Sequence, residues 1–336
     1  MSKHNASASA FGWDFQINSA IVLSIKNIYN IKKIKVEGEN EDIELELRSG
    51  KTIYAQAKSV YKYDDEHNII SNLRKSLKNF NELYHKVNNI DKLIYITNSP
   101  NPLKDDKSII LFSSNQEIKY DNLPENSKKR IDELLEKDNI NIDKSLLNIY
   151  VLSFYNETED RYKIINNNIR DFLDELEINI PSKKLMKLWK DILFSNTTSK
   201  NIKIKRSNFI WYIIVLLLDN YSNDNMQDID IGMMQEANEE YRKIIDYFSN
   251  DFKFISKILT DFQELNMTDY KLKDKVNYFV KEHWKFYVND IYGDLDVEDL
   301  DYDVKKYTIM SIIDRILFQR TNINKIKKKG LLDDEE

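Results

Sequence analysis

The 336-residue sequence predicts an α/β domain with a central mixed sheet flanked by helices, followed by an all-α domain. Up to about residue 155, short runs typical of strands are interspersed with segments whose apolar residues recur at steps of three and four. From about residue 159 onward only the helical spacing remains. Gly and Pro number only 6 and 4, which disfavours an all-β protein with many turns.

The elements can be placed along the chain from this spacing. The first part predicts a helix at 11–27, a strand at 33–37, a hairpin at 41–59, a helix at 68–86, strands at 93–97 and 108–114, a helix at 126–137 and a strand at 148–154. Helices are then expected at 159–177, 183–195 and 206–219, followed by three amphipathic helices at 241–259, 276–284 and 309–317. Two domains follow: residues 1–218, with a core at 1–155 and a helical extension, and a helical domain at 225–336.

Composition excludes several kinds of protein. Cysteine is absent, which rules out disulfides, thiolate metal sites and cysteine nucleophiles and favours a cytoplasmic location. The most apolar run, at 209–218, is ten residues long. Because a helix needs about 20 residues to cross a bilayer, this run indicates a buried helix and no membrane association is expected.

The hairpin at 41–59 is the most informative segment, and its register follows from its pattern. In both arms the odd-numbered positions are apolar and the even-numbered positions are polar or amphipathic. All the apolar residues share one face only if paired positions have numbers of equal parity, because a one-residue slip turns a strand over. A three-residue loop at 48–50 meets this condition, with Gly50 in the left-handed position, and it pairs Leu45 with Ile53.

This register brings three polar side chains together. Asp42 is expected directly across from Gln56, and Lys58 lies two residues further on, with facing Cβ atoms about 5 Å apart. Hydrolysis of a phosphodiester needs a cation that binds the phosphate and activates water, and Mg²⁺ prefers oxygen ligands of this kind. A nearby lysine can orient or deprotonate the water and offset developing charge. The hairpin therefore predicts a catalytic site of Asp42, Gln56 and Lys58, with Asp42 as bridging ligand of Mg²⁺ or Mn²⁺.

These residues resemble the signature of the PD-(D/E)XK nuclease superfamily, an Asp on one hairpin strand and a D/E-x-K element on the next. With GWDFQ at 12–16, ED at 41–42 and QAK at 56–58, the sequence is similar to the double-stranded DNA endonuclease domain of effectors in bacterial anti-phage systems of the CBASS and Lamassu types, over roughly residues 8–200. The resemblance implies a restriction-endonuclease-like core, Mg²⁺ dependence, cleavage of double-stranded DNA with little sequence preference, and homo-oligomerisation in the active state.

Gln56 departs from the acid that is usual in this superfamily. Because a neutral amide oxygen binds Mg²⁺ less well than a carboxylate, the ligand shell is expected to draw on other side chains. Glu37 is the preferred third metal ligand, with Gln16 of the GWDFQ segment and Glu39 as additional candidates.

Charge indicates where DNA would bind. The formal net charge of -6 argues against a protein that coats nucleic acid by charge alone. Residues 1–224 hold 33 Lys and Arg against 32 Asp and Glu, whereas residues 225–336 hold 17 against 24. DNA contacts are therefore expected in the first part, where Lys200, Lys203, Lys205 and Arg206 form a candidate phosphate-binding cluster. An ordinary basic loop before a helix is the alternative for this cluster.

The helical domain, with aromatic segments such as EHWKFYV at 282–288, is similar to the tail domains of nuclease effectors in three-component (ABC-3C) systems that contain an SMC-like ATPase, of which Lamassu is one. The resemblance implies that this domain docks the nuclease onto partner proteins, which keep it inactive until invading DNA is sensed.

Three other interpretations remain open. Charged residues on a hairpin face are often simply solvated, and edge strands carry Lys to prevent aggregation. A restriction or repair nuclease with its own C-terminal DNA-recognition domain would contain the same hairpin, although the acidic balance of residues 225–336 disfavours it. The neutral Gln56 is also compatible with a scaffold subunit whose nuclease site has decayed.

Overall fold

The computed structural model describes residues 3–60, 66–112, 115–154, 161–197, 202–221, 231–247, 252–267, 269–293 and 301–332. The chain forms two compact units. The first unit comprises Met1–Phe172 and Ser182–Arg206, and the second comprises Leu173–Pro181 and Ser207–Glu336. The apolar segment after Arg206, which we assigned from sequence to the first domain, therefore belongs to the second unit.

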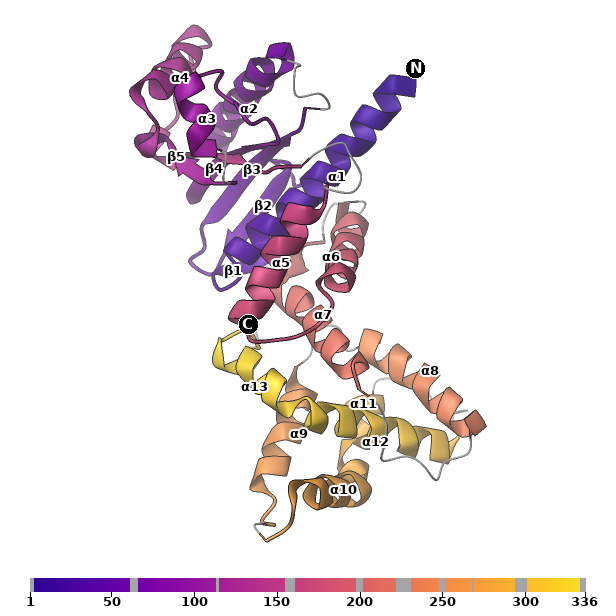
Figure 1. Ribbon diagram of the computed structural model, residues 1–336. Helices are drawn as coiled ribbons and strands as arrows, with labels where there is room; N and C mark the ends of the chain where they lie inside the picture. The colour runs from indigo at the N-terminus through magenta and orange to yellow at the C-terminus, as the bar shows by residue number, and fades with distance from the viewer. Residues whose placement is uncertain are drawn as a thin grey trace. The chain divides into compact units, whose positions relative to one another are not determined.

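The first unit is built on a seven-stranded sheet in the order β5-β6-β4-β3-β2-β1-β7 (Figure 1). The strands are β1 (Ile31–Val36), β2 (Ile43–Leu47), β3 (Thr52–Lys58), β4 (Ile90–Thr97), β5 (Glu117–Lys119), β6 (Leu147–Val151) and β7 (Ile204–Lys205). β4 runs parallel to both β3 and β6, and the other pairs are antiparallel. This confirms the central mixed sheet.

Helices cover both faces of this sheet. They are α1 (Lys3–Lys26), α2 (Glu66–Lys86), α3 (Asp106–Phe112), α4 (Glu125–Lys137), α5 (Lys163–Glu175) and α6 (Ser182–Thr197), with short 3₁₀ turns η1 (Tyr120–Asn122) and η2 (Lys144–Leu146). Side chains of α2 and α4 pack with β3, β4 and β6 in one apolar cluster that includes Leu77, Ile131 and Tyr95. On the other face α1 packs against β1, β2 and β3, and α6 packs against α1 and β1. Because α1 is enclosed, Phe15 and Val22 are both fully buried.

The strand expected at 108–114 is wrong. The chain forms the helix α3 over Asp106–Phe112, and residues 113–114 lie outside the described residues. Phe112 is buried whereas Ile110 is exposed, so the apolar run does not fill two faces of a sheet. A short apolar run does not separate strand from helix by spacing alone. The strand that completes this edge is β5, which carries only one apolar residue, Ile118.

The second unit is all-helical within the described residues, which confirms the expected all-α region. Its helices are α7 (Arg206–Asp219), α8 (Ile231–Tyr247), α9 (Lys253–Glu264), α10 (Leu272–His283), η3 (Trp284–Tyr287), α11 (Val288–Tyr292), α12 (Tyr302–Phe318) and α13 (Arg320–Lys328). α12 packs against α8, α9 and α10 and is buried on several sides.

The single helix expected at 241–259 is wrong, because α8 ends at Tyr247 and α9 begins at Lys253. The apolar spacing continues across both helices and hides the division. Residues 248–251 of this range lie outside the described residues, and Phe252 precedes the start of α9. Among the described residues, no helix is both long and apolar enough to span a membrane.

The hairpin turn offers a direct test of the fold. Gly50 has φ 79°, and a Cβ built there meets no atom within 4 Å. Gly50→Ala should therefore lower the free energy of unfolding by about 1 kcal/mol through backbone strain alone. Gly50→Asn should lose less, because Asn tolerates the left-handed region. Urea denaturation measures both, and an Ala variant as stable as the wild type would contradict this turn geometry.

Candidate functional site

The hairpin has the predicted register. Leu45 pairs with Ile53, and Ile43 pairs with Ala55. The Leu47 amide donates to the Lys51 carbonyl oxygen at 2.8 Å, which closes the three-residue loop. Continuing the same register by one step places Asp42, at the start of β2, opposite Gln56 of β3.

Asp42 and Lys58 meet across the hairpin. The Lys58 Nζ donates to Asp42 Oδ2 at 2.7 Å, and the Ala57 amide donates to the same oxygen at 3.0 Å. The Asp42 side chain is 18% exposed and the Lys58 side chain is 29% exposed, so the pair has access to solvent where β3 ends and β2 begins. Both donors to Asp42 Oδ2 therefore belong to β3. The other carboxylate oxygen, Oδ1, lies 3.5 Å from the Gln56 Nε2.

Gln56 lies deeper beside this pair. It is only 3% exposed, and its Nε2 donates to the Glu41 carboxylate. Within the described residues its Oε1 is buried without a hydrogen-bonding partner. The structure therefore brings the three predicted catalytic residues together, and adds a fourth polar side chain to them.

That fourth side chain, Glu41, was missed by our sequence analysis. It is 4% exposed, and burial raises its pKa to about 7 from an ordinary value of 4.5. The hydrogen bond from Gln56 and the charge of Lys58 oppose this rise, whereas the charges of Asp42 and Glu44 add to it. Strand alternation gave no signal for Glu41, because it lies in the loop before β2 and reaches Gln56 through the fold of that loop.

The loop between β1 and β2 presents Glu41 and Asp42 in a fixed geometry. The Glu37 amide donates to the Asp42 carbonyl at 2.8 Å, and the Gly38 amide donates to the Glu41 carbonyl at 3.0 Å. From β2, Glu44 Oε1 accepts from the Asn40 amide at 2.8 Å and from the Glu41 amide at 3.3 Å. A Cβ on Gly38 would meet the Glu44 carboxylate, so a larger residue there would displace the group that accepts from the loop amides.

Gln16 fastens the loop to α1. Its Nε2 donates to Glu37 Oε1 at 2.8 Å and to the Asp42 carbonyl at 2.9 Å. Gln16 therefore orients the Asp42 backbone. Glu37 is exposed, and its carboxylate accepts the second hydrogen bond of the Gln16 amide. These contacts give Gln16 and Glu37 a positioning role in the loop, next to the Asp42 backbone.

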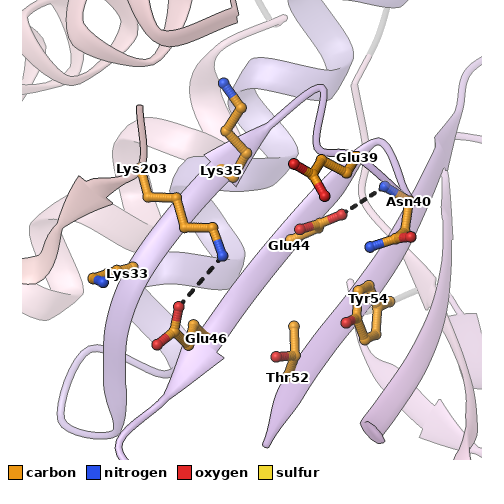
Figure 2. A pocket seen from close by; sticks show the side chains of 9 residues that line it. All are labelled: Lys33, Lys35, Glu39, Asn40, Glu44, Glu46, Thr52, Tyr54 and Lys203. Atoms are coloured by element: carbon orange, nitrogen blue, oxygen red, sulfur yellow. Dashed lines mark hydrogen bonds and ion pairs between the residues drawn. The ribbon is translucent and has the colours of Figure 1, made fainter. Parts of the chain in front are cut away.

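A polar cavity of about 340 Å³ lies on the open face of β1–β3 (Figure 2). Its lining alternates in charge: Lys33, Lys35, Glu39, Asn40, Glu44, Glu46, Thr52, Tyr54 and Lys203. The Lys203 Nζ lies 3.5 Å from Glu46 Oε2. The Lys35 Nζ donates to the Asn196 carbonyl oxygen at 2.9 Å. The structure thus places Glu39 at this cavity. Lysines and glutamates offset each other there, so the cavity is not a single-sign anion site.

The candidate DNA-binding cluster is only partly assembled. Lys200 lies outside the described residues. Lys203 is at the cavity and Lys205 is exposed in β7, whereas Arg206 is 1% exposed. A buried guanidinium is not presented to a DNA backbone, so Arg206 does not share an exposed surface with the two lysines.

Across the described ranges there is no group of three or more His, Cys, Asp or Glu side chains placed to hold a metal ion. The oxygen donors that converge are the carboxylates of Asp42 and Glu41 and the amide of Gln56. Two of their oxygens, Glu41 Oε1 and Gln56 Oε1, are buried acceptors with no donor among the described residues. Hard oxygen donors of this kind suit Mg²⁺ or Mn²⁺.

Comparison with known proteins gives limited similarity. No protein-family model matches the chain, and no curated protein matches it. Among solved structures, it is similar to the Cap4 SAVED/CARF-domain-containing receptor of Acinetobacter baumannii, at 17% identity and a TM-score of 0.39, covering 64% of this chain and 52% of that chain. The same receptor with the cyclic trinucleotide 3′3′3′-cAAA gives 16% identity and a TM-score of 0.39, and the match covers 75% of this chain and 61% of that chain.

The corresponding receptor of Moraxella osloensis gives 12% identity and a TM-score of 0.42, covering 74% of this chain and 60% of that chain. The chain thus spans between half and about three fifths of the length of these receptors. All three TM-scores lie below 0.5, so the function proposed below rests on the geometry of the hairpin site and on the sequence motifs.

The buried Glu41 predicts a pH dependence of stability. Because its pKa is about 7 in the folded protein and 4.5 is ordinary, the folded state holds a proton between these values that the unfolded state has lost. Stability therefore falls as pH rises through this window, by at most about 1.4 kcal/mol per pH unit. Glu41→Gln should remove this component. Urea unfolding in EDTA between pH 4.5 and about 7 measures this dependence. If the difference in unfolding free energy between wild type and variant stays the same across this range, the burial of Glu41 is contradicted.

Proposed function

We propose that the first unit is a Mg²⁺- or Mn²⁺-dependent double-stranded DNA endonuclease of the PD-(D/E)XK type, and that the chain is an effector of bacterial anti-phage defence. The observation that carries the enzymatic proposal is the 2.7 Å contact between Lys58 and Asp42 across the hairpin, beside the buried Gln56 amide.

The reaction is hydrolysis of a phosphodiester. A water oxygen bonds to the phosphorus, the bond from phosphorus to the leaving sugar oxygen breaks, the water loses a proton and the leaving oxygen gains one. A bound divalent cation supplies positive charge that polarises the phosphate and lowers the pKa of the attacking water.

The side chains at the hairpin site have separate roles in this reaction. Asp42 Oδ1 and Gln56 supply oxygen ligands from facing strands. Asp42 Oδ2 holds the Lys58 ammonium in place. An ammonium has three N–H donors, so the part-exposed Lys58 can still orient the water or contact a phosphate oxygen while it is bonded to Asp42. Gln16 holds the Asp42 carbonyl and thereby fixes the ligand strand against α1.

The defence role rests on sequence motifs. GWDFQ at 12–16, ED at 41–42 and QAK at 56–58 resemble endonuclease effectors of anti-phage systems, and the first and last of these segments place Gln16, Gln56 and Lys58 around Asp42. The all-helical second unit is suited to docking on protein partners, among which an SMC-like ATPase is the candidate. In this proposal the partners hold the nuclease inactive, and homo-oligomerisation accompanies activation.

Plasmid digestion tests the enzymatic proposal. The full chain, co-purified with the proteins encoded beside it and activated by them, should cut double-stranded plasmid DNA with Mg²⁺ and not with EDTA. Lys58→Ala should lower the cleavage rate by about 100-fold or more, because it removes the group that orients the water. Lys51→Ala, in the exposed turn of the same hairpin, should cleave like the wild type.

Three outcomes distinguish the alternatives. Intact plasmid with activated wild type would contradict the nuclease proposal. If the wild type also shows no Mg²⁺ or Mn²⁺ binding that depends on Asp42, the decayed-scaffold interpretation holds instead. Cleavage confined to particular sequences, without partner proteins, would favour a restriction or repair nuclease.

A further inference from the structure

The strongest unexplained feature of the first unit is a pair of buried acceptors at the hairpin site. Glu41 is 4% exposed and Gln56 is 3% exposed, yet the Oε1 atoms of both meet no donor among the described residues. A buried carboxylate or amide oxygen without a partner is costly. Both atoms are acceptors, on two side chains that already contact each other, and each can bind a cation or accept from a proton donor.

The backbone that carries both side chains is held by the fold. The Glu41 amide is directed to Glu44, and the Glu41 carbonyl accepts from Gly38, so its backbone is held at both ends. Gln56 lies within β3, between β2 and β4. The Gln56 amide nitrogen contacts the Glu41 carboxylate, and turning that amide by half a rotation would exchange its nitrogen and oxygen. Either orientation keeps the Gln56 amide group next to the carboxylates of Glu41 and Asp42.

The formal charges of the side chains at the hairpin site bear on cation binding. Asp42 and Lys58 cancel each other, and Gln56 is neutral, so the three predicted residues together carry no net charge to attract a cation. Glu41 in its ionised form changes the sum to one negative charge. Mg²⁺ is usually bound through one or two carboxylates, so a set of Asp42 and Glu41 with the Gln56 oxygen has the expected composition.

We propose that Glu41 is the third oxygen donor of the divalent-cation site, alongside Asp42 and Gln56, and that it supplies the negative charge which Gln56 lacks. This inference rests on the cation site of the proposed function and adds to it a ligand that precedes the hairpin strand. It replaces Glu37 in that role, because the Glu37 carboxylate accepts from Gln16 and helps to hold the loop. The acid that the nuclease motif usually carries on the strand of Gln56 would thus be supplied by Glu41 from the loop before β2.

Direct metal binding tests this assignment without relying on cleavage. Mn²⁺ titration of the metal-depleted full chain, followed by electron paramagnetic resonance at slightly alkaline pH, gives the affinity, and the Mn²⁺-induced rise in Tm gives a second readout. Glu41→Gln should weaken Mn²⁺ binding by about tenfold or more and reduce the rise in Tm at the same Mn²⁺ concentration. Glu82→Gln removes the same charge at an exposed position of α2 and should bind like the wild type.

A charge swap separates a ligand role from a merely structural one. In the double variant Glu41→Gln, Gln56→Glu the carboxylate returns to the strand, and Mn²⁺ affinity should recover to within a few-fold of wild type. If Glu41→Gln alone lowers the Tm in EDTA, this swap decides the question: restored binding supports the proposal, and absent binding overturns it.

The failures remain distinguishable. If Asp42→Asn abolishes Mn²⁺ binding while Glu41→Gln binds like the wild type, Glu41 is not a ligand and the cation site of the proposed function stands without it. If the wild type binds no Mn²⁺ at all, both proposals are overturned. In that case Glu41 is a buried acid whose only partner is the Gln56 amide.

Discussion

The register of β2 against β3 is the constraint on which the whole site depends. Because side chains alternate along a strand, a slip of one residue would turn Asp42 away from Gln56 and Lys58. Two features fix the register: the left-handed Gly50 in the turn, and the apolar odd-numbered residues that must all face α1. The site is therefore a consequence of burying one face of the hairpin, and its polar residues occupy the positions that remain.

A second constraint holds the start of β2. The loop from Glu37 to Asp42 lacks regular structure of its own, yet it is tied to three elements. Glu44 holds its backbone from β2, Gln16 holds it from α1, and Lys58 holds the Asp42 side chain from β3. A carboxylate placed so close to another is held there by the fold, and this arrangement is what a cation site requires before the cation arrives.

Much of this arrangement followed from local sequence patterns. The hairpin pairing was predictable because strict alternation and a single glycine leave one register that buries every apolar residue. Helices such as α2 and α4 were predictable because their apolar residues repeat over several turns. The short run before Phe112 was assigned wrongly as a strand, because so few residues give the same pattern in either conformation. The division between α8 and α9 was missed because packing requires the same apolar spacing on both sides of it.

The site itself was only partly visible in the sequence. Asp42, Gln56 and Lys58 stood out because the alternation places them on one face. Glu41 did not, because its contact with Gln56 depends on how the loop folds back, and no periodicity describes a loop. Glu37 and Gln16 were expected as ligands of the cation, and the structure adds that they bond to each other and that Gln16 bonds to the Asp42 carbonyl. Residues that act through loops are the part that sequence periodicity leaves undetermined.

The central claim is that a divalent cation binds between the two strands of this hairpin. The most direct measurement is a crystal structure of the full chain soaked with Mn²⁺, with data collected to locate the anomalous scattering of the ion. The account predicts one strong peak in contact with the Asp42 carboxylate and the Gln56 oxygen. A well-ordered site with no peak there, or with Asp42 and Lys58 on opposite faces of the sheet, would contradict it.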